Sequence, residues 1–173
     1  MINKKILILG GNGMLGKDMI NAFMNHGFKN ISYTTRKTKL KNNLKYIQKN
    51  IDKNIEPKIH KLKKLKFDII INCIGIIKPR IIENDIKSFE DTINVNALFP
   101  HKLANILNTN TKIFQITTDC VFSGDKGMYD ENSKYDASDL YGMSKSLGEV
   151  KTNNLYNIRC SIIGRELSTS YSL

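Results

Sequence analysis

Three side chains in the second half of the chain could together deliver a proton to a carbonyl oxygen. Tyr141 and Lys145 are four residues apart, so on a helix they share one face, and Thr118 ends an apolar run upstream of them. A free tyrosine, with a pKa of about 10, is a poor acid or base at neutral pH, but a nearby ammonium stabilises its phenolate and lowers that pKa. The hydroxyl of Thr118 can hydrogen-bond the same carbonyl oxygen. These residue types therefore favour proton transfer beside a carbonyl group.

The Tyr141–Lys145 pair is distinguished by its position rather than by its spacing. A chain this rich in tyrosine and lysine contains about one Tyr-x-x-x-Lys by chance, and a second pair stands at Tyr33 and Lys37. That second pair spans the end of an expected strand, where residues four apart are separated by about 13 Å. Tyr141 instead opens an expected helix, and we favour it over an ordinary exposed helix pair.

A glycine-rich turn near the N-terminus predicts a site for a dinucleotide pyrophosphate. The turn follows an apolar run at residues 4–9 and opens a helical pattern at 14–26. Gly10 permits a tight turn, Gly13 lets the backbone approach phosphate, and Gly16 lets the helix pack closely on the strand. The helix N-terminus adds free N–H groups and partial positive charge. The alternative is a glycine-rich turn that binds no ligand. We favour a cofactor site and expect contacts from Gly10, Gly13, Met14, Leu15 and Gly16.

The end of the second expected strand favours NADPH, with NADH as the alternative. NAD-selective sites place an acid there to bind the ribose 2′-OH, whereas a basic group accommodates the 2′-phosphate of NADPH. Here Arg36 follows the strand and no acid stands near it. We therefore expect Arg36 to bind the 2′-phosphate rather than to be an ordinary solvated arginine.

Length and composition predict a single domain that covers residues 1–173. We expect it to lie in the cytoplasm. No apolar run approaches the roughly 20 residues of a membrane span, and the first apolar run is too short for a signal peptide. The three cysteines lie in or beside apolar runs, which suggests reduced thiols rather than disulfides. The three scattered histidines lack metal-ligand spacing, so we expect no metal site and no membrane association.

The net charge of +11 invites a nucleic-acid interpretation, which the distribution of lysine does not favour. The lysines are spread over the whole chain, and the densest stretch, residues 58–66, has its apolar residues at helical spacing. Nucleic-acid binders usually add aromatic platforms or a groove-reading module, and the sequence contains neither. We therefore expect a solvated basic helix face and no nucleic-acid partner.

Alternating strand and helix patterns predict an α/β fold with a doubly wound parallel sheet, a Rossmann fold of strand order 3-2-1-4-5-6. The expected helices span residues 14–26, 55–65, 88–107 (interrupted by Pro100) and 140–150. The expected strands span residues 4–9, 30–34, 45–48, 67–73, 112–117 and 155–163. Thr118 then lies at the carboxyl edge of the sheet, where ligands bind in such folds. The polar connection at 119–139 is long, and such loops usually carry function.

Five segments of the chain resemble the dTDP-4-dehydrorhamnose reductase family of extended short-chain dehydrogenases/reductases. The similarity extends from residue 4 to about residue 166, and the wide glycine spacing G-x-x-G-x-x-G also suits that family. It implies an oxidoreductase that reduces a 4-keto group on a nucleotide-linked deoxysugar with NADPH or NADH, for cell-surface polysaccharide precursors such as dTDP-rhamnose. The matching segments are NCIG (72–75), INVNA (93–97), TTDCVFSG (117–124), YGMSK (141–145) and RCSIIG (159–164).

The resemblance assigns roles residue by residue. Thr118 takes the place of the catalytic hydroxyl, Tyr141 of the acid and Lys145 of its partner. Further cofactor-site positions are Asn96, expected to support the lysine through water, Asp52 near the adenine, and Gly75 where the backbone passes the cofactor. The family's substrate contacts come partly from the long loop, where Val121, Phe122 and Tyr129 are candidates, and largely from a later domain.

Other functions of the same fold remain open. Nucleotide-sugar dehydratases carry Thr-Asp-Glu, whereas Cys120 follows Asp119 here, which favours simple reduction. An epimerase needs the same Thr/Tyr/Lys set. The regulatory β-subunit of methionine adenosyltransferase is a non-catalytic relative, and the intact set at Thr118, Tyr141 and Lys145 argues against that class.

The resemblance also implies a second, C-terminal substrate domain that is missing from these residues. We therefore expect a cofactor-binding half whose partners are a nucleotide-diphosphate sugar and either a second copy in a homodimer or a complementing C-terminal chain. The isolated chain should bind NADPH but reduce sugars poorly, because remote substrate contacts supply the orientation on which the rate depends.

Overall fold

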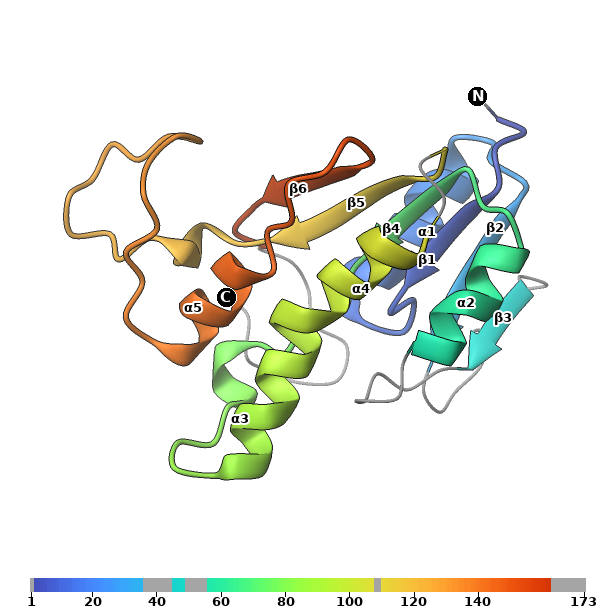
Figure 1. The fold of residues 1–173 in the computed structure, drawn as a ribbon. Helices are drawn as coiled ribbons and strands as arrows, with labels where there is room; N and C mark the ends of the chain where they lie inside the picture. The colour runs from blue at the N-terminus through green and yellow to red at the C-terminus, as the bar shows by residue number, and fades with distance from the viewer. Residues whose placement is uncertain (1, 36–44, 49–55, 108–109, 163–173) are drawn as a thin grey trace.

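The computed structural model describes residues 2–35, 45–48, 56–107 and 110–162. Six strands form one parallel sheet in the order β3-β2-β1-β4-β5-β6, which confirms the predicted doubly wound fold (Figure 1). The strands are β1 Ile6–Leu9, β2 Ile31–Thr35, β3 Lys45–Gln48, β4 Ile69–Asn72, β5 Lys112–Thr117 and β6 Leu155–Arg159.

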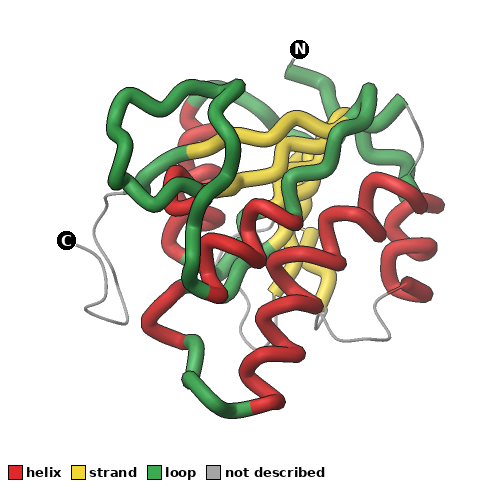
Figure 2. The backbone as a smooth tube through the Cα atoms, turned by 60° about the vertical axis from the view of Figure 1, so that its left-hand side comes forward, coloured by secondary structure: helices red, strands yellow, loops and turns green. Residues whose placement is uncertain are grey.

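Helices cover both faces of the sheet (Figure 2). Alternate residues of β1 point to opposite faces: Leu7 packs with α2 and α4, whereas Ile8 packs with α1. The two apolar layers thereby enclose β1, whose four side chains are all buried. The helices are α1 Met14–Asn25, α2 Glu56–Lys64, α3 Ile86–Thr92, α4 Phe99–Ile106 and α5 Leu140–Leu147. None of the helices in these described ranges is long and apolar enough to cross a membrane.

The expected helix at 88–107 is longer and more irregular than the pattern indicated. It begins at Ile86, because the side chain of Asp85 accepts from the backbone N–H groups of Lys87 and Ser88, both at 3.2 Å. Between α3 and α4 the chain forms a π-helical turn, η2 (Ile93–Leu98). Pro100 lacks the N–H that would donate to the carbonyl four residues earlier, so it interrupts the α-helical ladder there without ending the helical path.

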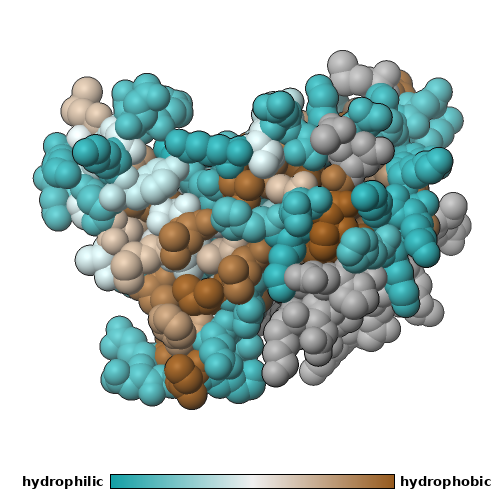
Figure 3. Space-filling view, in the orientation of Figure 1, coloured by the Kyte–Doolittle hydropathy of each residue, from teal (hydrophilic) through white to brown (hydrophobic). Residues whose placement is uncertain are grey.

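Most other boundaries move inward by a few residues. Strand β4 begins at Ile69 rather than residue 67, and α5 ends at Leu147 with Gly148 as its cap. Two single 3₁₀ turns, η1 (Lys78–Arg80) and η3 (Asp119–Val121), follow β4 and β5 and were not expected. Apolar side chains also reach the surface over α3, η2 and α5 (Figure 3), namely Ile86, Phe89, Leu98, Met143 and Leu147.

Candidate functional site

The glycine turn after β1 is closed by hydrogen bonds to β2. The backbone N–H of Gly10 donates to Oγ1 of Thr34 at 2.9 Å, and the N–H of Gly11 donates to the Thr34 carbonyl at 2.9 Å. Gly10 has a φ of +81°, a conformation that side chains rarely adopt. Sequence reasoning did not single out Thr34, which fixes this turn through both its hydroxyl and its carbonyl.

The glycines of the turn serve different purposes. A Cβ on Gly16 would lie 2.3 Å from the Gly10 carbonyl oxygen, so Gly16 is needed for α1 to pack against the turn. Gly13 is exposed, and a Cβ there would meet only the Gly10 carbonyl oxygen, at 3.3 Å. A side chain at position 13 would therefore need only a small shift of the Gly10 carbonyl, much less than at position 16.

The N-terminus of α1 adjoins this open position. Helix α1 begins at Met14, its N-cap Gly13 offers no side-chain cap, and its first turn contains no acidic residue. Amides at a helix start without such caps attract anions. Leu15 is half-buried against Ile8 and its neighbours, so its backbone is held firmly. The residues present thus fit a dinucleotide pyrophosphate.

Thr118 and Tyr141 are brought together at the carboxyl edge of β5. Helix α5 packs directly on the η3 turn, since a Cβ on Gly142 would lie 2.3 Å from the Cys120 carbonyl oxygen. The side chains of Thr118 and Tyr141 lie close enough that the Thr118 hydroxyl affects the pKa of Tyr141. The Thr118 hydroxyl also accepts from the backbone N–H of Cys120 and donates to Oδ1 of Asp119, both at 3.2 Å.

The start of α5, and with it Tyr141, is fixed by a residue that sequence reasoning missed. The Asp139 carboxylate accepts from the backbone N–H of Gly142 at 2.7 Å and from Nζ of Lys78 at 2.8 Å. The first of these hydrogen bonds lowers the pKa of Asp139 most, and the second adds to it. An Asp three residues before a helical glycine is an N-cap signal that could have been found.

The electrostatics of Tyr141 differ from the expectation. Burial raises the pKa of Tyr141 above its ordinary value of 10.0, and the nearby hydroxyl of Thr118 opposes that rise. The expected lowering by Lys145 is not found, because Lys145 Nζ donates to the carbonyl of Ile116 at 2.9 Å instead. The structure therefore presents Tyr141 as a protonated donor.

Lys145 lies buried beneath the site. Its side chain is 7% exposed, and burial lowers its pKa from 10.5 to about 8, against the opposing charges of Cys160 and Glu149. A Cβ on Gly75 would lie 3.7 Å from Lys145 Nζ. Lys145 and Gly75 therefore lie next to each other in the fold.

Asn96 anchors the segment that contains Gly75. Its Oδ1 accepts from the Ile76 N–H at 2.8 Å, and its Nδ2 donates to the Ile76 carbonyl at 2.9 Å. Nδ2 also donates to Oγ of Ser144 at 3.2 Å, which joins the π-helical turn to α5. Asn96 thus acts directly on Ile76 and Ser144, and its expected support of Lys145 stays a prediction.

The remaining candidates divide into three groups. Arg36 and Asp52 lie outside the described residues. Val121 is fully buried, so it supports the loop and the expectation of a sugar contact there is wrong. Phe122 and Tyr129 stack with ring centroids 4.6 Å apart in the loop beyond β5. Within the described ranges no group of three or more His, Cys, Asp or Glu residues could hold a metal ion.

Solved structures share this fold. A hypothetical dTDP-4-dehydrorhamnose reductase from Sulfolobus tokodaii superposes with a TM-score of 0.75 at 24% identity, covering 94% of this chain and 57% of its own. The ADP-L-glycero-D-manno-heptose-6-epimerase of Helicobacter pylori gives a TM-score of 0.72 at 17% identity, covering 85% and 49%. At these identities the likeness establishes the fold alone, and the chain spans about half the length of these proteins.

A third similar structure contains ligands. MoeE5, in complex with UDP-glucose and NAD, gives a TM-score of 0.68 at 15% identity, covering 90% of this chain and 52% of its own. Among proteins of curated function, none matches this chain significantly. A family model described as the RmlD substrate binding domain matches residues 4–165, which include the glycine turn, η2, the Thr118 turn and α5. The chain therefore belongs to the RmlD substrate binding domain family.

Proposed function

We propose that this chain is the cofactor-binding part of a sugar-nucleotide oxidoreductase that reduces the 4-keto group of a nucleotide-linked deoxysugar with NADPH. The observation that carries the proposal is the convergence of Thr118, Tyr141 and Lys145 at one sheet edge. Membership of a family of sugar-nucleotide enzymes supports it. The same reaction class would supply precursors of cell-surface polysaccharides.

The cofactor site follows from the geometry of the described residues. The open position at Gly13 and the amides of Met14 and Leu15 would hold the pyrophosphate. The Lys145 ammonium, beside Gly75, would hydrogen-bond the ribose next to the nicotinamide. NADPH, when bound, supplies the hydride that reaches the carbonyl carbon.

The chain's own residues would manage the proton. Tyr141 is protonated at neutral pH and would donate its phenolic proton to the carbonyl oxygen, so an alcohol and a tyrosinate result. Thr118 holds the same oxygen after its hydroxyl turns from Asp119 towards the substrate. The ammonium of Lys145 would stabilise the tyrosinate once it turned from the Ile116 carbonyl, to which it donates in this structure.

Preference for NADPH over NADH is the finer part of the proposal and depends on Arg36. A guanidinium at the end of β2 would pair with the 2′-phosphate in a charge-assisted hydrogen bond. We expect a lower dissociation constant for NADPH than for NADH, measured by nicotinamide fluorescence, and Arg36→Ala should remove the difference. Tighter binding of NADH by the wild-type chain would overturn the assignment.

Two other functions are the alternatives. An epimerase of this fold would use the same residues, and the similarity to an epimerase structure keeps that function in view. A dehydratase is disfavoured, since Cys120 stands where a glutamate would be needed. A regulatory, non-catalytic chain would bind the dinucleotide without turnover. Net oxidation of NADPH by a sugar substrate distinguishes the reductase from these alternatives, since none of them consumes the cofactor.

In this proposal, binding of the sugar nucleotide requires residues beyond the region that matches the family. The solved relatives are about twice as long as the part that this chain covers. A nucleotide-diphosphate sugar would be completed by additional residues of the same polypeptide, by a second copy or by a complementing chain. The three cysteines, all free, fit a cytoplasmic location.

The test uses NADPH labelled with tritium at C4 and a panel of nucleotide-linked 4-ketosugars. We expect the 173-residue chain to bind NADPH and to transfer label only slowly. Tyr141→Phe should bind NADPH equally but transfer no label. Equal transfer by this variant would exclude Tyr141 as the acid, and fast saturable turnover by the chain alone would refute the need for further residues.

A further inference from the structure

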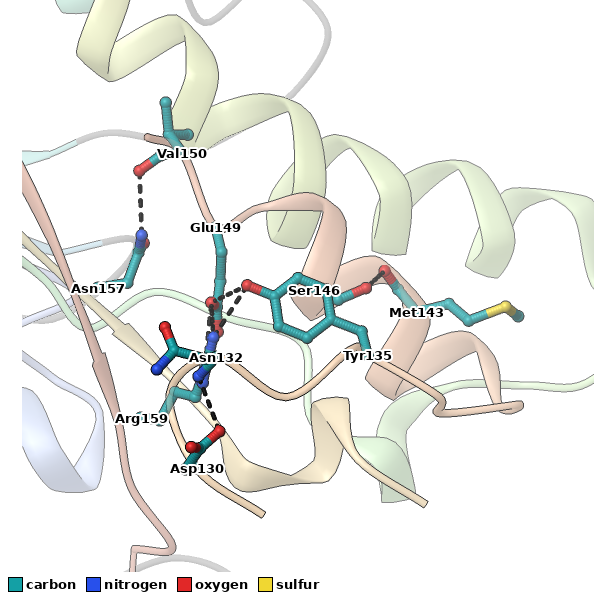
Figure 4. Close-up of polar contacts among 9 residues, drawn as sticks. All are labelled: Asp130, Asn132, Tyr135, Met143, Ser146, Glu149, Val150, Asn157 and Arg159. Atoms are coloured by element: carbon teal, nitrogen blue, oxygen red, sulfur yellow. Dashed lines mark hydrogen bonds and ion pairs between the residues drawn. The ribbon is translucent and has the colours of Figure 1, made fainter. Parts of the chain in front are cut away.

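A closed network of side chains joins three segments around the candidate site (Figure 4). Glu149 follows the cap of α5, Arg159 is the last residue of β6, and Tyr135 belongs to the loop between η3 and α5. Arg159 donates to Glu149 from Nε, at 2.9 and 3.1 Å, and from Nη2 at 2.8 Å. The Tyr135 hydroxyl donates to Glu149 at 2.8 Å and accepts from Arg159 at 2.9 Å.

The ion pair within the network is sheltered from water, whereas Tyr135 lies at its exposed side. The side chain of Glu149 is 2% exposed and that of Arg159 is 20% exposed. Burial raises the pKa of Glu149, but the hydrogen bonds from Arg159 and Tyr135 outweigh burial. The net pKa is lower than the ordinary value, so the carboxylate stays ionised. Removing one partner of such a pair leaves an uncompensated buried charge, so Glu149 and Arg159 depend on each other.

Two contacts connect the network to Thr118. The guanidinium carbon of Arg159 lies 5.2 Å from the ring centroid of Phe122 and 5.1 Å from that of Tyr135. Thr118 is the N-cap of the η3 turn and Phe122 is its C-cap. Two residues beyond Arg159, the hydroxyl of Ser161 donates to Asp119 at 2.5 Å. The turn carrying Thr118 is thus held by β6 as well as by β5.

We propose that Glu149, Arg159 and Tyr135 are positioning residues, which hold the 119–139 loop and the Thr118 turn in register with the helix that carries Tyr141. The network links the end of α5 to the loop, so displacement of the loop would move Thr118 relative to Tyr141. Its consequence for sugar reduction rests on the proposed function. The structural role does not, and it is measurable without cofactor or substrate.

Amide hydrogen exchange, followed by NMR on the full 173-residue chain, tests the proposal. The Phe122 N–H donates to the Asp119 carbonyl at 2.9 Å and the Ala137 N–H to the Val121 carbonyl at 3.2 Å, so these amides report the loop. The Ile6 N–H, which donates to the Asn30 carbonyl at 2.9 Å, reports global unfolding. A role in overall stability alone would accelerate all three amides together.

Two variants and one control distinguish these outcomes. Glu149→Gln should accelerate exchange at the two loop amides at least about tenfold relative to Ile6, because Arg159 is left buried without its counter-charge. Tyr135→Phe keeps the ion pair and should accelerate exchange at the two loop amides by about threefold relative to Ile6. Asp91→Asn removes the exposed ion pair with Lys87 on α3 and should change none of the three.

The proposal is overturned if the loop amides exchange at the wild-type rate in both variants, or only in step with Ile6. If Glu149→Gln does not fold, Tyr135→Phe decides by the same criterion. Failure of the label-transfer experiment would leave this result unaffected, because the exchange rates depend on no reaction.

Discussion

Gly13 and Gly16 differ in what an added methyl group would meet, and this separates ligand binding from folding at the glycine turn. Alanine at position 16 would place its Cβ 2.3 Å from the Gly10 carbonyl oxygen and 3.0 Å from the Gly11 Cα, both backbone atoms. Such overpacking costs up to about 3 kcal/mol, of which helix propensity returns about 1 kcal/mol. We expect Gly16→Ala to lose about 2 kcal/mol of unfolding free energy.

Alanine at position 13 should have the opposite profile. The residue has a φ of −70°, which any side chain adopts, and only one contact, at 3.3 Å. The unfolding free energy should therefore stay within about 1 kcal/mol of wild type. NADPH affinity should fall at least about tenfold, because the methyl group holds the phosphate away from the α1 amides and weakens charge-assisted hydrogen bonds.

Urea unfolding followed by circular dichroism gives the first quantity, and titration of NADPH fluorescence gives the second. Each variant is the control for the other. Normal NADPH affinity in folded Gly13→Ala would refute the assignment of this turn to the pyrophosphate. Unchanged stability of Gly16→Ala would refute the packing explanation.

Three further predictions concern residues that support the site. Lys145 has a folded pKa of about 8 against 10.5, so it holds fewer protons in the folded chain between these values and should contribute a rise of about 3 kcal/mol in stability across that pH window. The buried Cys73 thiol, whose pKa is raised, contributes in the opposite direction, so the Lys145 contribution is measured as the difference between the wild type and Lys145→Met. Lys145→Met should lack this rise in urea unfolding. Thr34→Val leaves the Gly10 N–H without its acceptor and should cost about 1–3 kcal/mol, with weaker NADPH binding in the same titration. Asp139→Ala removes the α5 cap and should lower the unfolding free energy by about 1 kcal/mol, whereas an unchanged value would show that the Gly142 hydrogen bond contributes nothing.

The order of the sheet was predictable because each strand is a short apolar run that alternates with a helical pattern. Parallel strands joined by right-handed crossovers leave few arrangements, and the observed order is the predicted one. The proximity of Thr118 and Tyr141 followed, since both stand at carboxyl-edge positions. These features depend on local pattern and on general rules of topology.

Other features depend on contacts between distant residues and had no local signal. The side chain of Asn96 hydrogen-bonds Ile76 and Ser144 from the π-helical turn. Residue propensities do not predict such a turn. Burial of Tyr141, which raises its pKa, reflects packing of α5 on the η3 turn. Val121 was expected to face substrate, but the chain turns inward there and buries it.

The most direct test of the proposed dinucleotide site is an NMR titration of the chain with NADPH. Saturable amide shift changes should appear in three segments that are distant in sequence, namely at Gly13, at Gly75 and at Thr118, with one common dissociation constant. Lys145→Met should weaken that binding and reduce the change at Gly75, which adjoins its ammonium. Absence of saturable shifts, or shifts confined to other parts of the fold, would contradict the assignment of this sheet edge to a nicotinamide cofactor.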